Sequence, residues 1–161
     1  MKTSRVSTPV LFVDATDAGI TAVGVGGRRA RAGNTNDDSS LARRWRMLAK
    51  KELQAFFFGR LRFFSTPYDL RNMPPFTRAV LRVTAQIPYG KVRSYQWIAE
   101  RLGKPKASRA VGNALARNPI PIIIPCHRVV RSDGTLGGYA LGLSWKRRLL
   151  DLEKRNRGRL S

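Results

Sequence analysis

Short apolar runs near the N-terminus predict a small sheet. Residues 10–13 form one such run, and residues 20–25 alternate apolar and small side chains before a Gly-Gly pair. Alternation with a period of two is typical of a strand with one buried face. We therefore expect a hairpin or the edge of a small sheet. Residues 26–40 are rich in Gly, Arg, Asn, Asp and Ser, a composition that predicts a loop.

The segment that follows has helical spacing. Apolar residues recur every three or four positions between residues 41 and 58, with Arg and Lys between them, and Gly59 is placed to end the helix. Residues 61–70 are predicted to be extended, with Pro67 interrupting them. Residues 1–72 are thus expected to form an α/β domain whose aromatic side chains belong to its core. No pattern within them indicates a catalytic group.

The second half, residues 73–161, begins with Met-Pro-Pro and is mainly helical in its pattern. Residues 76–87 place apolar side chains on one face, which predicts a helix. Ser94 is a good N-cap for a helix over residues 95–102, and a further helix is expected over residues 106–117. Two short helices joined by a tight turn that contains glycine predict a helix-turn-helix motif.

The chain beyond this motif is irregular until its last helix. Residues 121–125 are very apolar and are predicted to be extended, whereas Arg-Ser-Asp-Gly at 131–134 is typical of a turn. Several glycines between residues 137 and 142 then flank a loop. Ser144 is placed to cap a final helix with apolar residues on one face.

Charge changes this picture by suggesting a partner. The chain of 161 residues has 31 Lys and Arg against 10 Asp and Glu, a net charge of +21. Residues 1–70 carry 12 basic and 6 acidic residues, net +6, and residues 71–161 carry 19 and 4, net +15. Such a balance favours a polyanion, either nucleic acid or an anionic membrane surface, over a merely solvated basic surface. Contact with the polyanion is expected mainly in the second half.

Other classes of protein are disfavoured by composition. No apolar run approaches the roughly 20 residues that span a bilayer. The N-terminal apolar stretch is short and is followed by Asp14 and Asp17, which is atypical of a signal peptide. A single cysteine excludes an internal disulfide framework, so a reducing compartment and a cytoplasmic location are expected.

The second helix of the predicted motif is suited to close approach to a duplex. Alanine and glycine fill much of residues 106–117, while Arg109 and Asn113 lie one turn apart. Small side chains alone are equally typical of close helix packing. Nine Lys and Arg against one acidic residue between residues 91 and 131 favour contact with phosphates, although the helix has few groups that could read base edges.

The only cysteine and the only histidine, Cys126 and His127, are adjacent. Taken singly, each is more often a buried structural residue than a catalytic one. One Cys and one His cannot by themselves supply the ligands of a zinc site. On an extended backbone adjacent side chains point to opposite sides, so a direct contact between them would need a bend and a water could connect them.

A thiolate suits attack on a saturated carbon, where no oxyanion hole is needed. The imidazole would then need a carboxylate behind it. The second half offers only four carboxylates: Glu100, Asp133, Asp151 and Glu153. Of these, Glu153 lies near the end of the last predicted helix, which could fold back over the site.

Four segments resemble the O6-alkylguanine-DNA alkyltransferases. "NPIPIIIPCHRVV", at 118–130, is similar to the active-site signature of that family, and "IPYGKVRSYQWIAERLG" to its tyrosine-bearing segment. "KASRAVGNALARNP" resembles its recognition helix, and "GTLGGYALGLSWKRRLLDLE" its active-site loop and closing helix. The similarity covers about residues 73–155, whereas the first 70 residues resemble the family only in general layout.

The resemblance implies an α+β fold and a repair activity. A small N-terminal α/β (RNase H-like) domain at 1–72 would precede a helical domain at 73–161 with a winged helix-turn-helix-like DNA-binding motif. The protein would bind double-stranded DNA in the minor groove and flip an O6-alkylated guanine out of the stack. Its cysteine would take the alkyl group in one irreversible step. No cofactor, metal, membrane or obligate protein partner is implied, and a monomer is expected.

The resemblance also assigns roles to single residues. Cys126 would be the nucleophile, His127 a base acting through water, and Glu153 the carboxylate that polarises His127. Asn118 would organise the active-site turn. Tyr95 would help to rotate the phosphate and protonate the departing base. Arg109 would fill the gap left by the flipped nucleotide. Further DNA contacts would come from Ser94, Lys106, Ala107, Gly112 and Asn113, and the pocket walls from Val129, Leu136, Tyr139 and Ala140.

This chain departs from the family pattern at three points. Ala140 stands where Ser or Gly is common, which a backbone contact tolerates. Leu141 is bulkier than the usual Gly and is expected to narrow the pocket. The zinc site that some relatives carry cannot form, because no further Cys or His is present.

Three other functions remain open at this point. A damage-binding protein of the alkyltransferase-like type would recognise the lesion without repairing it, but such proteins lack the nucleophilic Cys. A helix-turn-helix regulator would show strong sequence preference. A thiol hydrolase would turn over many times, whereas the transfer implied here consumes one protein per event.

Overall fold

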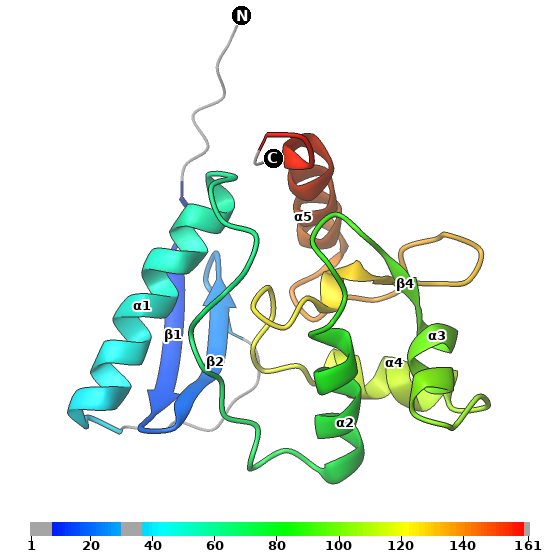
Figure 1. Ribbon diagram of the computed structural model, residues 1–161, viewed down its shortest axis with the longest axis horizontal. Helices are drawn as coiled ribbons and strands as arrows, with labels where there is room; N and C mark the ends of the chain where they lie inside the picture. The colour runs from blue at the N-terminus through cyan, green and yellow to red at the C-terminus, as the bar shows by residue number, and fades with distance from the viewer. Residues whose placement is uncertain (1–7, 30–36, 160–161) are drawn as a thin grey trace, which may run out of the picture.

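The computed structural model describes residues 8–29 and 37–159 (Figure 1). Within this part, a three-stranded antiparallel sheet and one long helix precede a group of shorter helices and a second, two-stranded sheet. The α+β class predicted from the sequence is confirmed. No helix of the described part is long and apolar enough to cross a membrane.

The N-terminal sheet contains the predicted hairpin. Strand β1 (Leu11–Thr16) pairs antiparallel with β2 (Gly19–Val25), and β2 pairs with β3 (Arg28–Arg29). Apolar side chains such as Ile20 and Val23 are fully buried, as the alternation indicated. The loop predicted over residues 26–40 is confirmed at the turn of residues 26–27 and at residues 37–39, but it is wrong at Arg28–Arg29, which form β3, and at Ser40, which begins the helix that follows. Residues 30–36 lie outside the described part.

Helix α1 (Ser40–Phe57) lies along this sheet (Figure 1). The Ser39 hydroxyl accepts a hydrogen bond from the Ala42 N–H at 3.1 Å and caps its first turn. Gly59 follows the helix with φ of +70°, the left-handed conformation expected after a C-cap. The buried face includes Phe56 and Phe57, as predicted for the core, whereas Phe58 and Phe63 are exposed and the prediction is wrong for them.

Residues 60–72 are irregular rather than extended. The buried carboxylate of Glu52, on α1, accepts hydrogen bonds from the backbone N–H groups of Ser65 (2.8 Å) and Thr66 (3.1 Å). Tyr68 makes a single bridge to Ile20 of β2. Backbone groups of this segment are therefore satisfied by a side chain and one bridge instead of a strand ladder.

Four helices make up most of the second half: α2 (Pro75–Thr84), α3 (Tyr95–Arg101), α4 (Ser108–Ala116) and α5 (Leu143–Asn156). Each matches a predicted helix to within a turn. The Ser94 hydroxyl accepts a hydrogen bond from the Trp97 N–H at 2.9 Å, as the predicted cap of α3. The cap predicted for the last helix is wrong, because α5 begins at Leu143 and its N-cap position is Gly142 rather than Ser144.

A two-stranded parallel ladder joins segments that are distant in sequence. Strand β4 (Arg93–Ser94) pairs with β5 (Val129–Val130). The ladder runs directly into α3 on one side and directly follows a 3₁₀ turn at Cys126–Arg128 on the other. Tyr95, the first residue of α3, is thereby fixed beside the Cys126 turn.

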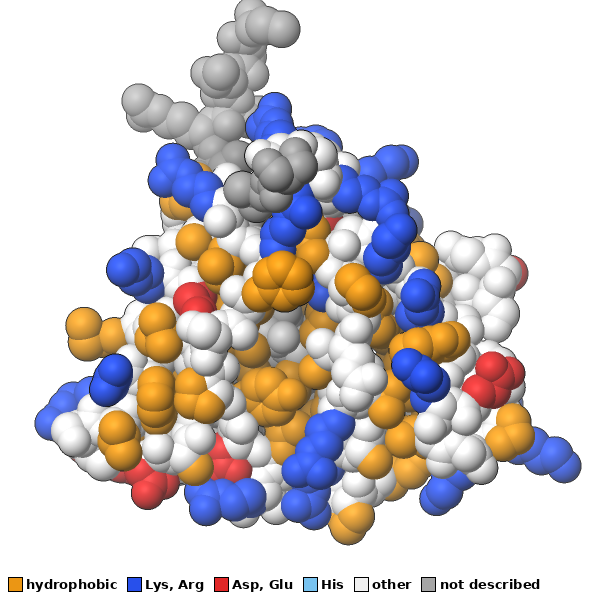
Figure 2. All heavy atoms as spheres, viewed as in Figure 1, with side chains coloured by type: hydrophobic (Ala, Val, Ile, Leu, Met, Phe, Trp, Pro, Cys, Tyr) orange, Lys and Arg blue, Asp and Glu red, His pale blue; other side chains and the backbone are white. Residues whose placement is uncertain are grey.

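The buried apolar side chains of both halves form one continuous cluster that runs from the sheet to α5. The Val23 N–H of β2 donates to the Pro119 carbonyl at 2.8 Å, so the sheet also supports the chain that leads to Cys126. The division into domains at residues 72 and 73 stays a prediction. Figure 2 shows Lys and Arg side chains spread over much of the face in view and few acidic ones among them.

Candidate active site

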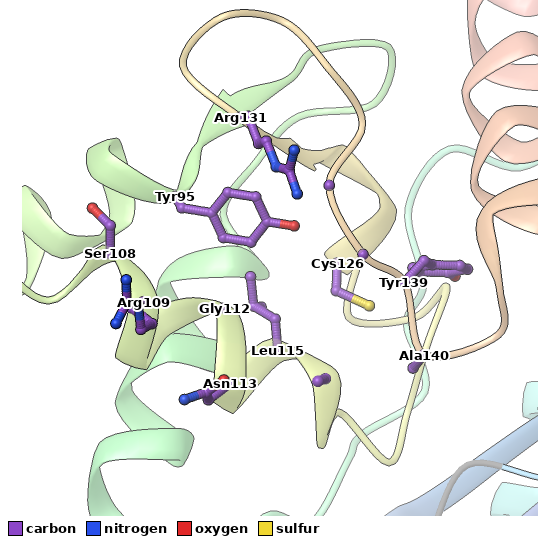
Figure 3. Close-up of a pocket in the computed structure, with 13 residues that line it drawn as sticks. Tyr95, Ser108, Arg109, Gly112, Asn113, Leu115, Cys126, Arg131, Tyr139 and Ala140 are labelled. Atoms are coloured by element: carbon purple, nitrogen blue, oxygen red, sulfur yellow. The ribbon is translucent and has the colours of Figure 1, made fainter.

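A cavity of about 890 Å³ lies between α3, α4, the Cys126 turn and the loop that follows β5 (Figure 3). Its walls bring together most of the residues that the sequence indicated. They are Tyr95, Ser108, Arg109, Gly112, Asn113, Leu115, Ala116, Cys126, Arg131, Gly137, Gly138, Tyr139 and Ala140. Exposed Arg109 and Arg131 and buried Cys126 share this one cavity, so a molecule that enters from the surface can reach the thiol.

The turn before Cys126 is built around Asn118, which is 1% exposed. Its side-chain N–H donates to the Ile124 carbonyl and to the Cys126 sulfur, each at 3.1 Å, and its Oδ1 accepts from the Ile120 N–H at 3.0 Å. The organising role expected for Asn118 therefore has a direct geometric basis. That Asn118 matters for transfer stays a prediction.

The extended conformation predicted for residues 121–125 is wrong. Pro121 and Ile124 form an isolated bridge across a tight turn, and Ile122 has φ of +76°. It is the one non-glycine residue with positive φ in the described part of the chain. A β-branched residue in this region is strained by about 1–3 kcal/mol, which only a well-determined surrounding can hold. Full burial of Ile122 and the bonds of Asn118 provide that surrounding.

Cys126 is a protonated thiol at rest. Burial raises its pKa to about 11, although the Asn118 hydrogen bond and the Lys146 charge act in the opposite direction. A thiol with such a pKa has very little thiolate at neutral pH. Nucleophilic attack by this sulfur therefore requires a base in the site.

His127 and Glu153 form a buried pair at 2.7 Å between Nε2 and Oε1. Arg128 also donates to the Glu153 carboxylate, with its NH2 group at 2.8 Å, and the Gly90 N–H donates at 2.9 Å. Burial opposes ionisation of Glu153, but His127 and Arg128 outweigh it and lower its pKa to about 2. Glu153 is thus an acceptor only, so Nε2 of His127 carries the proton that joins them.

This arrangement leaves the other ring nitrogen of His127 able to accept a proton. Burial lowers the pKa of His127, so the ring is neutral at neutral pH with a lone pair on Nδ1. Nδ1 is buried and makes no hydrogen bond to any described residue, and the same holds for the hydroxyl of Tyr139. The two rings meet edge to face, with centroids 6.4 Å apart. His127 has the protonation state and the carboxylate partner of a general base.

The geometric reason for expecting a water between Cys126 and His127 does not hold. It assumed an extended backbone, whereas Cys126–Arg128 is a 3₁₀ turn. No hydrogen bond between the thiol and the ring occurs among the described residues. A bridging water stays a prediction, now motivated by the unpaired Nδ1.

Tyr95 enters the cavity from the start of α3, and its hydroxyl points toward the side of Cys126 and the loop beyond β5 (Figure 3). Burial raises the pKa of Tyr95, so the phenol is protonated. The loop passes so close that a Cβ on Gly137 would lie 2.5 Å from the Tyr95 oxygen. Gly137 also has φ of +69°. A side chain there is therefore disfavoured both by the close contact with Tyr95 and by the backbone conformation.

Replacing Gly137 with alanine should displace Tyr95 and lower the alkyl transfer that the sequence resemblance implies by roughly tenfold, since a shift of one ångström in a positioning group is that costly or more. Gly134→Ala is the matched control, because Gly134 also has positive φ but a Cβ added there would meet no atom within 4 Å. Single-turnover rates of both variants on one lesion duplex test this. An equal loss of rate in both variants would show that strain at a glycine with positive φ, rather than displacement of Tyr95, slows the reaction.

Helix α4 presents the DNA-facing residues predicted from the sequence. Exposed Arg109, in its first turn, and Asn113, one turn later, both line the cavity, and Gly112 lies against the ring of Tyr95. Lys106 is exposed in the turn before α4, and Ala107 occupies the N-cap position. Ser94 uses its hydroxyl to cap α3. Contact of these residues with DNA stays a prediction.

Two predicted pocket residues and one predicted obstacle are placed elsewhere. Val129 and Leu136 are absent from the cavity walls of the described chain; their backbone carbonyls instead accept hydrogen bonds from the Lys146 ammonium group. Leu141 is fully buried in the core and does not narrow the cavity. Its carbonyl accepts from Arg28 at 3.2 Å.

Three basic residues near the site were not anticipated. Arg128 donates hydrogen bonds to Glu153, Lys146 is fully buried beside the loop that follows β5, and Arg131 lies at the cavity wall. Arg128 could have been anticipated, because it directly follows the Cys126–His127 pair in the sequence. Lys146 and Arg131 stand in segments where a basic residue is more often merely solvated.

A buried thiol in a cavity beside two short helices, with a neutral histidine and its carboxylate buried behind it, fits a DNA-binding protein that uses its thiol as a nucleophile. Comparison with known proteins specifies the class. The family model described as "6-O-methylguanine DNA methyltransferase, DNA binding domain" matches residues 75–155. The chain belongs to this family, as the motifs in its sequence predicted.

Curated relatives of known class support the same family assignment. The methylated-DNA–protein-cysteine methyltransferase of Methanosarcina barkeri is 50% identical over 111 residues, which is 67% of this chain and 68% of that protein. Its counterpart in Mycolicibacterium paratuberculosis is 49% identical over 108 residues, covering 67% and 65%. The chain thus spans about two thirds of the length of these relatives. A crystal structure of Mycobacterium tuberculosis OGT in complex with DNA has a TM-score of 0.79 at 37% identity, covering 91% of this chain and 87% of that one.

Proposed function

We propose that this protein repairs DNA by transferring the alkyl group of O6-alkylguanine in duplex DNA to Cys126, once and irreversibly. The observation that carries the proposal is the shared cavity: the thiol lies in the same hollow as Tyr95 and the exposed Arg109 of α4. A base in a duplex cannot reach a buried sulfur. The nucleotide must therefore be flipped out of the stack into this cavity. Family membership and the relative solved with DNA support this reading.

The chemistry is a displacement at the alkyl carbon. His127 takes the thiol proton at Nδ1, through a water molecule, while Glu153 stabilises the imidazolium that results. The sulfur forms a bond to the alkyl carbon, and the bond from that carbon to O6 breaks. The guanine leaves as an anion and takes a proton from the phenol of Tyr95, which solvent restores. A thioether is stable, so the protein is spent.

Recognition of DNA rests on charge and on close approach. The net charge of +21 favours phosphate contact, and the small side chains of α4 allow the helix to lie deep in a groove. Arg109 is placed to fill the stack after the guanine leaves. We propose the minor groove as the docking side, a monomer as the active species and the cytoplasm as its location, a reducing compartment that would keep the thiol available.

A damage-binding function without repair is the second candidate. Such a protein would use the same cavity and helix, but the thiol, the neutral histidine and the buried carboxylate would have no chemical role in it. A protein that keeps the thiol in the cavity and a neutral histidine paired with a buried carboxylate is better explained as a transferase.

Cys126→Ser separates the two candidates. Since Cys126 is the only cysteine, the variant has no thiol. With a duplex whose O6-methyl group carries an isotope label, the wild-type protein should acquire the label and the variant should not, while both bind the duplex with similar affinity. Label that stays on DNA with the wild-type protein despite tight binding would contradict transfer and establish damage recognition.

A further inference from the structure

A buried ammonium group holds the loop that forms one wall of the cavity. Lys146, on the first turn of α5, has no exposed surface. Its Nζ donates to three backbone carbonyls: those of Val129 at 2.6 Å, Gly138 at 3.0 Å and Leu136. A lysine ammonium has three N–H groups, so this set satisfies every donor. Burial of a cation is unfavourable and lowers the pKa of Lys146 to about 8. The three hydrogen bonds offset part of this unfavourable free energy.

The three carbonyls connect two parts of the site. Val129 belongs to β5, which directly follows the Cys126 turn. Leu136 and Gly138 belong to the loop whose next residues, Tyr139 and Ala140, line the cavity. The same Nζ therefore joins the strand that follows the Cys126 turn to the loop on the opposite side of the cavity.

Apart from the contact of the Tyr95 hydroxyl with the Gly138 backbone, the other bonds of this loop are local or peripheral. The Arg131 N–H donates to the Thr135 carbonyl at 2.8 Å and the Gly142 N–H to the Tyr139 carbonyl at 3.0 Å, which shape its two ends. Arg28 donates to the Leu141 carbonyl beyond it. In the described part of the chain, Lys146 is the residue that binds two carbonyls of the loop, those of Leu136 and Gly138, and connects them to β5.

We infer that Lys146 is a positioning residue for alkyl transfer, whose ammonium group fastens the loop with Leu136 and Gly138 to β5 and so sets the wall formed by Tyr139 and Ala140 opposite Cys126. The inference rests on the proposed function. A planar guanidinium cannot direct donors to three carbonyls around one nitrogen, so an arginine is a poor substitute. The ammonium also lies 5.9 Å from the centre of the Tyr95 ring, so the same group borders both walls.

Lys146→Met tests the inference, because methionine has a similar length but no donor. Amide hydrogen exchange across residues 132–141 should become faster, while exchange in α4 stays unchanged. The single-turnover rate of transfer at saturating lesion duplex should fall at least tenfold, and the concentration for half-saturation should change little. Arg147→Met is the matched control, since Arg147 is the exposed neighbour on the same helix and loses the same charge.

A reagent that needs no pocket wall separates positioning from effects on the thiol. Alkylation of Cys126 by iodoacetamide should change much less than transfer from DNA. Equal losses in both reactions would overturn the inference, because Lys146 would then act on the thiol itself, and so would unchanged exchange in the loop. If Lys146→Met does not fold, Lys146→Gln retains two donors and should show intermediate exchange in the same loop; wild-type exchange there would likewise overturn it.

The exchange measurement uses no lesion, so it is independent of the proposed function. If wild-type protein failed to alkylate Cys126 while the loop still loosened in Lys146→Met, the proposed function would be wrong and the fastening of the loop would stand.

Discussion

Replacing His127 with alanine is expected to slow alkyl transfer from an O6-methylguanine duplex by about 100-fold or more, the usual contribution of a general base. The reason is the state of the nucleophile. Burial holds the pKa of Cys126 at about 11, so without a base the reaction must wait for rare thiolate. Affinity for the duplex should be almost unchanged, because the ring is buried behind the cavity. Single-turnover rates and binding curves for both proteins measure the two effects separately.

The pH dependence of the variant distinguishes a missing base from a damaged fold. Between about pH 6.5 and 8, well below the pKa of Cys126, thiolate increases about tenfold per pH unit, and the rate of His127→Ala should follow it. The wild-type rate should rise less steeply, since its thiol proton passes to a neutral ring within the site. Added imidazole should restore part of the lost rate. A pH-independent loss that imidazole does not reverse would show that His127 is structural.

Replacing Arg109 with alanine is expected to reduce repair of duplex DNA by roughly 10- to 100-fold, because extrusion of a base costs a few kcal/mol that an inserted side chain offsets. Transfer from the free base O6-benzylguanine, which needs no flipping, should remain close to that of the wild-type protein. The exposed position of Arg109 in the first turn of α4, at the cavity wall, supports the difference. Rates on the duplex and on the free base, compared for one protein preparation, measure it.

Arg117→Ala is the matched control for lost charge. Arg117 is exposed at the end of the same helix and is not part of the cavity wall. It should weaken binding to damaged and undamaged duplex alike and leave the ratio of the two unchanged. If Arg109→Ala behaved in the same way, Arg109 would be a phosphate contact and not the residue that replaces the base. Equal losses on duplex and free base would instead indicate a disturbed cavity.

The helices could be predicted because their signals are local. Periodic apolar residues indicated α1 to α5, and Ser94 with Gly59 marked two of their ends. The partnership of His127 with Glu153 was predictable through the family resemblance and because few carboxylates were available. Element ends shifted by a few residues: α1 begins after the local cap at Ser39, and α5 begins after Gly142, which makes no side-chain cap bond.

The Cys126 turn was not predictable from pattern. A short apolar run is the usual sign of a buried strand, but the bridge between Pro121 and Ile124 closes it into a turn with Ile122 at positive φ. That conformation is held by Asn118 side-chain bonds to the backbone. Such bonds leave no periodic signal in a sequence.

The roles of Lys146 and of the loop carbonyls were hidden for a related reason. A lysine on an amphipathic helix is normally solvated, and the three groups that bind it are backbone atoms. Any residue type offers a carbonyl, so nothing in the loop sequence marks the acceptors. Val129 and Leu136 were consequently assigned to the pocket, where their side chains do not lie.

The most direct test of the central claim is the intact mass of the protein after it reacts with excess duplex that contains one O6-methylguanine, followed by peptide mapping. The proposed transfer predicts a gain of one methyl group per chain, located on the peptide that contains Cys126, with no further gain over time. An unchanged mass in protein shown to be bound to the lesion would contradict alkyl transfer. A methyl group on any other peptide would contradict the assignment of Cys126.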